Sequence, residues 1–210
     1  MSPHGRPKGE FPLGGTECRG SESAFADSDG TKASRVSRLA ARSAKGAPVN
    51  DATRPEGFRR VADALAEHGH PHAPLWLAVA ARTSAEAAQA LGIEVGQIAK
   101  SVIFRRRADD AAVLVVASGD GRVDEKKVAQ QVGAIGRADA EFVKSRTGFS
   151  IGGVAPIGHA TPPVVLIDRA LFRFDESWAA AGHPRGVFKL APAALVRLTG
   201  APVADVLESS

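Results

Sequence analysis

From Arg54 onward, short helices and apolar strands follow one another without a strict strand–helix alternation. Capped, periodic segments predict helices over residues 54–69, 83–92, 124–133, 139–148 and 191–200. Apolar runs predict strands over residues 75–80, 100–104, 111–118, 162–168 and 187–190. This order favours a mixed sheet with helices packed on it over an all-parallel sheet. We therefore predict an α/β (mixed) fold in a single domain.

The helix predictions rest on spacing and on capping residues. Phe58, Val61 and Leu65 recur at helical spacing and form one apolar face. Asp124 and Asp139 each open a later helical segment, where a carboxylate can accept hydrogen bonds from free N–H groups. These segments should therefore pack as helices against the sheet.

The first 50 residues differ in composition from the rest of the chain. They are rich in Gly, Ser, Pro and charges and lack periodicity, so we expect residues 1–50 to be a disordered extension and residues 55–206 to be the folded domain. Residues 1–54 hold nine Lys or Arg against six Asp or Glu, whereas residues 55–210 hold 18 against 17. Any nucleic-acid contact of the folded part should therefore involve a local patch. Three interpretations of residues 1–50 remain open: a basic tail that contacts RNA, an inert tail, and a mis-assigned start.

Several chemical classes find no support in the sequence. The single cysteine, Cys18, cannot form a disulfide framework or a cysteine-rich zinc site. His68, His70 and His72 lie in a segment broken by Gly and Pro, without partner ligands, so we expect no metal. No phosphate loop of the G-x-x-x-x-G-K-[ST] form occurs.

The segment "SGDGRVD" follows a predicted strand and precedes a helix, as a dinucleotide-binding loop does. Asp124 stands where the third glycine of that motif is needed, so a turn is favoured. A nucleotide-binding oxidoreductase is a distant alternative that requires a bound cofactor. No run approaches the roughly 18 apolar residues of a membrane helix. We expect a cytoplasmic protein without membrane association.

Three features remain: Lys100 at the start of a strand, the glycine-rich segment 148–159, and the turn 181–184. The segments "GQIAKSVIF", "GFSIGGVAPIGH", "VVLID" and "AAAGHPRGVFKLAPAALVRLTGAPVADV" occur in this order, and together they resemble the YbaK/EbsC family. This family includes the editing domain of bacterial prolyl-tRNA synthetases and free-standing aminoacyl-tRNA deacylases. The resemblance covers about residues 55–206. It implies a compact α/β domain with a partly curled mixed sheet.

The resemblance implies hydrolysis of an amino acid wrongly esterified to tRNA, without metal or organic cofactor. Lys100 matches the functional lysine of the family, and His183 matches a histidine that lines the amino-acid pocket in some members. To hydrolyse an activated ester, a site has chiefly to hold and orient the ester and to stabilise the negative charge that develops on its carbonyl oxygen. Backbone N–H groups at Gly152 and Gly153 are suited to that oxyanion, because no side chain blocks the approach. The neighbouring Ser150, Ile151 and Pro156 are the remaining predicted substrate-binding residues.

The expected partner is therefore the 3′ aminoacyl end of a mischarged tRNA, most simply tRNA for proline. The resemblance also admits an aminoacyl-tRNA synthetase or an elongation factor as a partner. Small residues at the pocket wall favour a small amino acid, with alanine ahead of serine or threonine. A non-catalytic RNA-binding or synthetase-associated module of the same fold is the alternative.

Overall fold

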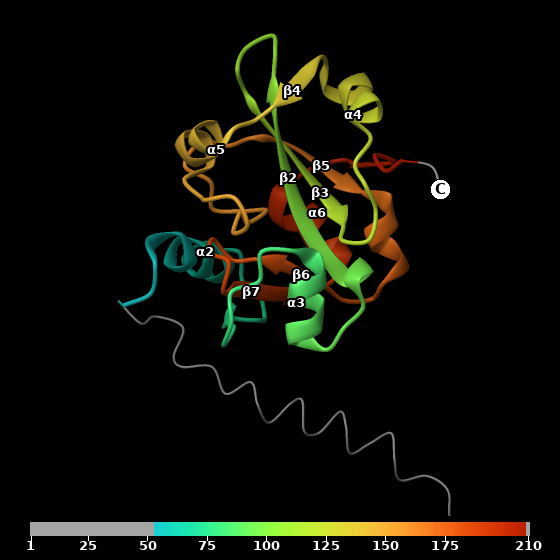
Figure 1. The fold of residues 1–210 in the computed structure, drawn as a ribbon. Helices are drawn as coiled ribbons and strands as arrows, with labels where there is room; N and C mark the ends of the chain where they lie inside the picture. The colour runs from blue at the N-terminus through green and yellow to red at the C-terminus, as the bar shows by residue number, and fades with distance from the viewer. Residues whose placement is uncertain (1–52, 209–210) are drawn as a thin grey trace, which may run out of the picture.

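The computed structural model describes residues 53–208, and the prediction for residues 1–50 lies outside this range. Eight strands form one sheet in the order β1-β7-β6-β2-β3-β5-β8, and β4 pairs with β2 outside this order (Figure 1). Their bounds are β1 Leu75–Trp76, β2 Ile98–Arg106, β3 Ala112–Ser118, β4 Ile135–Arg137, β5 Val164–Asp168, β6 Ser177–Ala180, β7 Gly186–Leu190 and β8 Val203–Ala204.

The centre of the sheet is the antiparallel hairpin of β2 and β3, which pair from Ala99↔Ser118 to Arg105↔Ala112. Parallel pairs join β3 to β5, β5 to β8, and β2 to β6, while β6 and β7 form an antiparallel pair. The sheet is therefore mixed, as the sequence predicts.

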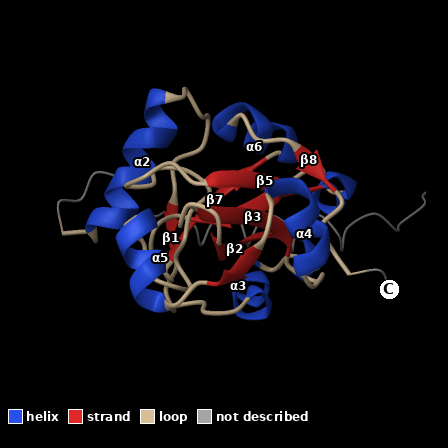
Figure 2. Ribbon diagram, turned by 90° about the horizontal axis from the view of Figure 1, so that it is seen from above, coloured by secondary structure: helices blue, strands red, loops and turns tan. Residues whose placement is uncertain are grey.

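Five helices in the described range cover the sheet, and Figure 2 shows α3 and α6 on opposite sides of it. Their bounds are α2 Glu56–Glu67, α3 Ser84–Leu91, α4 Glu125–Val132, α5 Ala140–Thr147 and α6 Pro192–Thr199. The carboxylates of Asp124 and Asp139 accept hydrogen bonds from the first turns of α4 and α5, as predicted. Thr83 caps α3 in a reciprocal capping box with Glu86. No helix among residues 53–208 is long and apolar enough to cross a membrane.

Strand β3 is buried along its whole length and supplies both sides of the core. Leu114 and Val116 pack in the cluster that contains Phe58 of α2 and Leu195 of α6. The alternate residues of β3 join a second cluster with Val128 of α4. This continuous apolar run is typical of a strand that helices cover on both faces.

The predicted elements differ from the observed ones mainly at their ends. The strand expected at 75–80 is confined to Leu75 and Trp76, because β7 pairs with only these two residues. The sequence analysis did not identify β4, β6 or β8, or the 3₁₀ helices η1 Val95–Gln97 and η2 Arg169–Arg173. Residues 118–121 form a turn, closed by a hydrogen bond from Gly121 N–H to the Ser118 carbonyl.

Candidate active site

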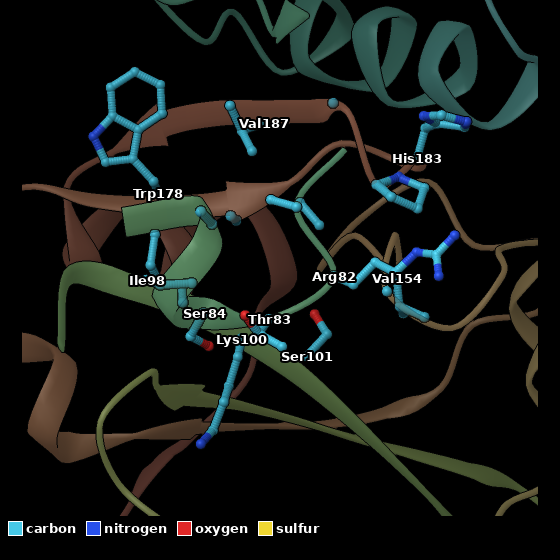
Figure 3. A pocket seen from close by; sticks show the side chains of 18 of the residues that line it. Arg82, Thr83, Ser84, Ile98, Lys100, Ser101, Val154, Trp178, His183 and Val187 are labelled. Atoms are coloured by element: carbon cyan, nitrogen blue, oxygen red, sulfur yellow. The ribbon is translucent and has the colours of Figure 1, made fainter. Parts of the chain in front are cut away.

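A cavity of about 320 Å³ opens where β2 and β6 separate. β6 pairs with β2 only at Ile98 and Ala99, and β4 begins to pair with it at Phe104. Within the described range, residues 100–103 therefore have no strand partner on this edge. The lining includes residues 81–84, 98–101 and 178–180, together with Ile151, Gly152, Val154, His183, Pro184, Gly186 and Val187 (Figure 3).

Lys100 lines the cavity with a half-buried side chain. In Figure 3 this side chain extends away from His183 and Arg82. Its ammonium group donates hydrogen bonds to the carbonyl oxygens of Gly119, at 3.5 Å, and Gly121. Burial lowers the pKa of Lys100, while the nearby carboxylates of Asp120 and Asp168 act in the opposite direction. An ammonium has three hydrogens, so one is left for a further acceptor.

The glycine-rich segment forms a turn at 150–153 that closes one side of the cavity. Gly152 lines the cavity with φ +87°, and no described residue accepts a hydrogen bond from its N–H. Gly153 packs against the backbone of His183, where an added Cβ would lie 2.7 Å from the His183 Cα. Its N–H donates to the Ser150 carbonyl at 3.0 Å. In this structure the Gly153 N–H therefore closes the turn, and its role as an oxyanion donor stays a prediction.

His183 lines the cavity and is held on two sides. Its ring stacks on Trp76, with centroids 4.8 Å apart and planes 21° apart. Its Nδ1 accepts a hydrogen bond from the Arg185 backbone N–H at 3.1 Å. Burial, followed by the charge of Arg185, lowers the pKa of His183, which favours the neutral ring near pH 7. A neutral ring that accepts at Nδ1 carries its hydrogen on Nε2 and can donate it.

The remaining predicted site residues have different positions. Ile151 lines the cavity and is 61% exposed. Ser150 is exposed and Pro156 is buried, and neither belongs to the lining. The cavity thus brings together Lys100, Ile151, Gly152 and His183, but not Ser150, Gly153 and Pro156.

Sequence reasoning missed the wall formed by residues 81–84 and the lining residues Ser101 and Trp178. Thr83 in this wall is the N-cap of α3. The Ser101 hydroxyl is buried without a hydrogen-bond partner in the described range. The sequence feature that could have indicated Ser101 as a lining residue is its position directly after Lys100.

Two further polar residues, Asp168 and His159, have structural roles. Asp168 is 1% exposed, and it accepts hydrogen bonds from the backbone N–H groups of Ser118, at 3.1 Å, and Ala170, at 3.2 Å. It therefore caps η2, as its position after "VVLI" suggests. His159 is hydrogen-bonded through Nε2 to the Ala155 carbonyl at 2.8 Å, which ties the end of the glycine-rich segment to its middle.

The ionisable side chains of the described cavity lining are all basic. Arg82, Lys100 and His183 are its ionisable side chains, and none of the described lining residues is acidic. Within residues 53–208, no group of three or more His, Cys, Asp or Glu side chains is placed to hold a metal ion. His70 instead contacts the Lys189 carbonyl at 2.8 Å. A cavity of this character suits an anionic ligand.

The fold and the cavity define the class of protein: a single mixed α/β domain with the architecture of aminoacyl-tRNA editing domains. Residues 78–198 match the family described as "Aminoacyl-tRNA editing domain". The match covers more than half of the chain, and the chain belongs to this YbaK-type family.

Relatives and solved structures agree with this assignment. The chain is 38% identical over 111 residues to the uncharacterized protein YwhH of Bacillus subtilis (strain 168), covering 52% of this chain and 70% of that protein. A solved structure, provisionally named a trans-editing enzyme for prolyl tRNA synthetase, is 42% identical with a TM-score of 0.70, covering 75% of this chain and 100% of the other. A hypothetical protein of known structure is 31% identical with a TM-score of 0.67, covering 71% and 99%.

Proposed function

We propose that this protein is a trans-editing deacylase that hydrolyses the ester between a small amino acid and the 3′ end of tRNA, with tRNA for proline as the first candidate. The observation that carries the proposal is the cavity itself, where Lys100, the free Gly152 N–H and His183 come from three separate segments. Membership of the editing family and the similarity to a provisionally named trans-editing enzyme support it.

In this reaction, water attacks the ester carbonyl carbon and the bond to the ribose oxygen breaks. The ribose oxygen takes up a proton, and free amino acid and free tRNA are released. The Gly152 N–H and the third hydrogen of the Lys100 ammonium are donors suited to the developing oxyanion. Such preorganised donors are usually a large contribution to catalysis of acyl transfer.

None of the described lining residues is placed to act as a general base. The described lining has no carboxylate, and the neutral His183 ring has its acceptor nitrogen occupied by the Arg185 N–H. We therefore assign proton transfer to the attacking water and the ribose hydroxyl of the substrate, and to His183 the role of a donor that orients the substrate.

The apolar part of the lining favours a small side chain. Val154, Ala179 and Val187 narrow a cavity of about 320 Å³ that must also take the ribose. We expect alanine to be removed most rapidly, ahead of serine and threonine.

Single-turnover hydrolysis of tRNA for proline charged with alanine, cysteine, serine, threonine or phenylalanine tests the proposal. Rapid loss of a small amino acid supports it. Preference for the phenylalanyl ester contradicts the substrate class. Binding of every charged tRNA without hydrolysis favours the non-catalytic module.

A further inference from the structure

The turn 118–121 lies at the end of β3 and holds the Lys100 ammonium group. The carbonyl oxygens of Gly119 and Gly121, on either side of Asp120, accept its hydrogen bonds. No described carboxylate forms a direct ion pair with Lys100. The Lys100 ammonium is therefore held by two uncharged carbonyl groups, and the acidic residue Asp120 lies between those two glycines in the sequence.

Close packing fixes this turn on two sides. A Cβ added to Gly119 would overlap the Val95 carbonyl oxygen of η1, and one added to Gly121 would overlap the Leu207 side chain. The backbone contact makes glycine necessary at position 119, whereas at position 121 the Leu207 side chain would have to rotate to admit a Cβ. The two carbonyls that receive Lys100 have little freedom to move.

Asp120 anchors the same turn through its side chain. Its carboxylate forms an ion pair with Arg173 of η2, and its Oδ1 lies 2.9 Å from the Ser118 hydroxyl. Arg173 also donates to that hydroxyl at 3.2 Å. Asp168 caps the start of η2 and accepts from the Ser118 N–H, so η2 and the turn are tied to the same strand end.

We propose that Asp120 and Arg173 are positioning residues, which hold the Gly119 and Gly121 carbonyls so that the Lys100 ammonium keeps a fixed direction with one hydrogen left for the substrate. This inference rests on the proposed deacylase function. A direct ion pair between Asp120 and Lys100 would occupy that hydrogen and neutralise the charge. Because the Asp120 carboxylate anchors the turn and does not contact Lys100 directly, the ammonium is held in place while its charge and one hydrogen stay free for the substrate.

The electrostatics agree with this arrangement. Burial lowers the pKa of Lys100, and Asp120, followed by Asp168, opposes that effect. Arg173 is the cation that faces the same carboxylates. Loss of the Asp120 charge should therefore lower the pKa of Lys100 further.

The test is Asp120→Asn, with Asp109→Asn as the matched control. Asp109 also forms a surface ion pair with an arginine, at 2.7 Å to Arg106, but it lies at the far end of β2. We expect Asp120→Asn to lower kcat by up to about 10²-fold, the cost of misplacing a catalytic group by about 1 Å. Because Lys100 acts in its protonated form, activity is lost as pH rises through its pKa. The alkaline loss should therefore begin at lower pH in Asp120→Asn and remain unchanged in Asp109→Asn.

Arg173→Gln distinguishes the anchoring role of Asp120 from the effect of its charge. It is also the test variant if Asp120→Asn fails to fold. It removes the anchor while the Asp120 charge remains. We expect a lower kcat without a shift of the alkaline loss to lower pH. A kcat equal to that of the parent protein in both folded variants would overturn the proposal.

A measurement independent of activity separates this inference from the proposed function. NMR titration of isotopically labelled lysine side chains, with Lys100 assigned through Lys100→Arg, reports its pKa directly. A lower pKa in Asp120→Asn than in the parent and in Asp109→Asn supports the inference, and an equal pKa in all three overturns it. A parent protein that cleaves no mischarged tRNA overturns the proposed function, and with it the catalytic part of the inference.

Discussion

The two ends of strand β2 hold their cations in different ways. At the hairpin end, Arg105 and Arg106 form ion pairs with Asp110, at 2.5 Å, and Asp109, at 2.7 Å. At the cavity end, Lys100 is held by backbone carbonyls instead. A carboxylate partner neutralises a cation and occupies its donors, whereas carbonyl partners leave the charge and one donor free. Strand β2 thus carries two arginines that are neutralised by ion pairs at one end and a lysine that is held by carbonyl groups at the other.

The largest effect should follow from Lys100→Ala. Loss of a preorganised charged donor typically reduces the rate by about 10²–10³-fold. The fold loses the packing of the side-chain stem and the hydrogen bonds to the Gly119 and Gly121 carbonyls. Single-turnover deacylation and a thermal unfolding curve measure the two effects. Lys100→Arg should also be poor, because a planar guanidinium does not replace a compact ammonium. Near-normal hydrolysis by Lys100→Ala would contradict the role of Lys100.

A smaller effect should follow from Gly153→Ala on the cavity side. The added Cβ would lie 2.7–2.8 Å from the His183 backbone, which cannot rotate away. We expect a loss of about 1–3 kcal/mol in the free energy of unfolding, typical of overpacking. Gly136→Ala is the control near the hairpin end, because its Cβ would meet its nearest neighbour only at 3.6 Å. Equal stability of the two variants in chemical denaturation would contradict the close packing at Gly153.

His159 is a further ionisable group held by a carbonyl, and it predicts a pH effect on stability. Burial, the largest cause, lowers the pKa of His159 from 6.5 to about 4. As pH falls between these values, the unfolded chain binds a proton that the folded chain does not, so stability is full above pH 6.5 and is lost towards pH 4. His159→Gln should reduce the fall in Tm over this range, whereas His72→Gln, at an exposed position, should not. Parallel Tm curves for all three proteins would rule out this contribution.

The smallest effect should follow from Arg106→Ala at the hairpin end. Its ion pair is exposed, and such pairs contribute little to stability. We expect unchanged deacylation and a Tm close to that of the parent protein. A loss of activity comparable to that of Lys100→Ala would break the distinction between the two ends of β2.

Much of the fold could be predicted because its signals are local. The apolar face of Phe58, Val61 and Leu65 and the caps at Asp124 and Asp139 each act within one helix, and the structure confirms them. The short strands were missed because their pairing depends on distant segments. Ser177–Ala180 becomes β6 only because β7 and the start of β2 lie beside it.

The site was predicted less completely than the fold. Lys100 and His183 were found through the family resemblance and Gly152 through its accessible backbone, and all three line one cavity. The hydrogen bond that occupies Gly153 could not be predicted, since the sequence does not show which N–H closes a turn. The turn at 118–121 was predicted correctly, but its contact with Lys100 depends on the register of β2 and β3.

The pairing of β1 with β7 has a consequence for how the protein is made. Leu75 pairs with Val187, so this contact joins segments near opposite ends of the described range. Contacts between distant segments form late, because a long loop must close first. During synthesis, β1 has no partner until residues 186–190 leave the ribosome, and the wall at His183 emerges only shortly before them. A partly synthesised chain therefore has no complete cavity, and the proposed editing activity should arise only as the last part of the domain is released.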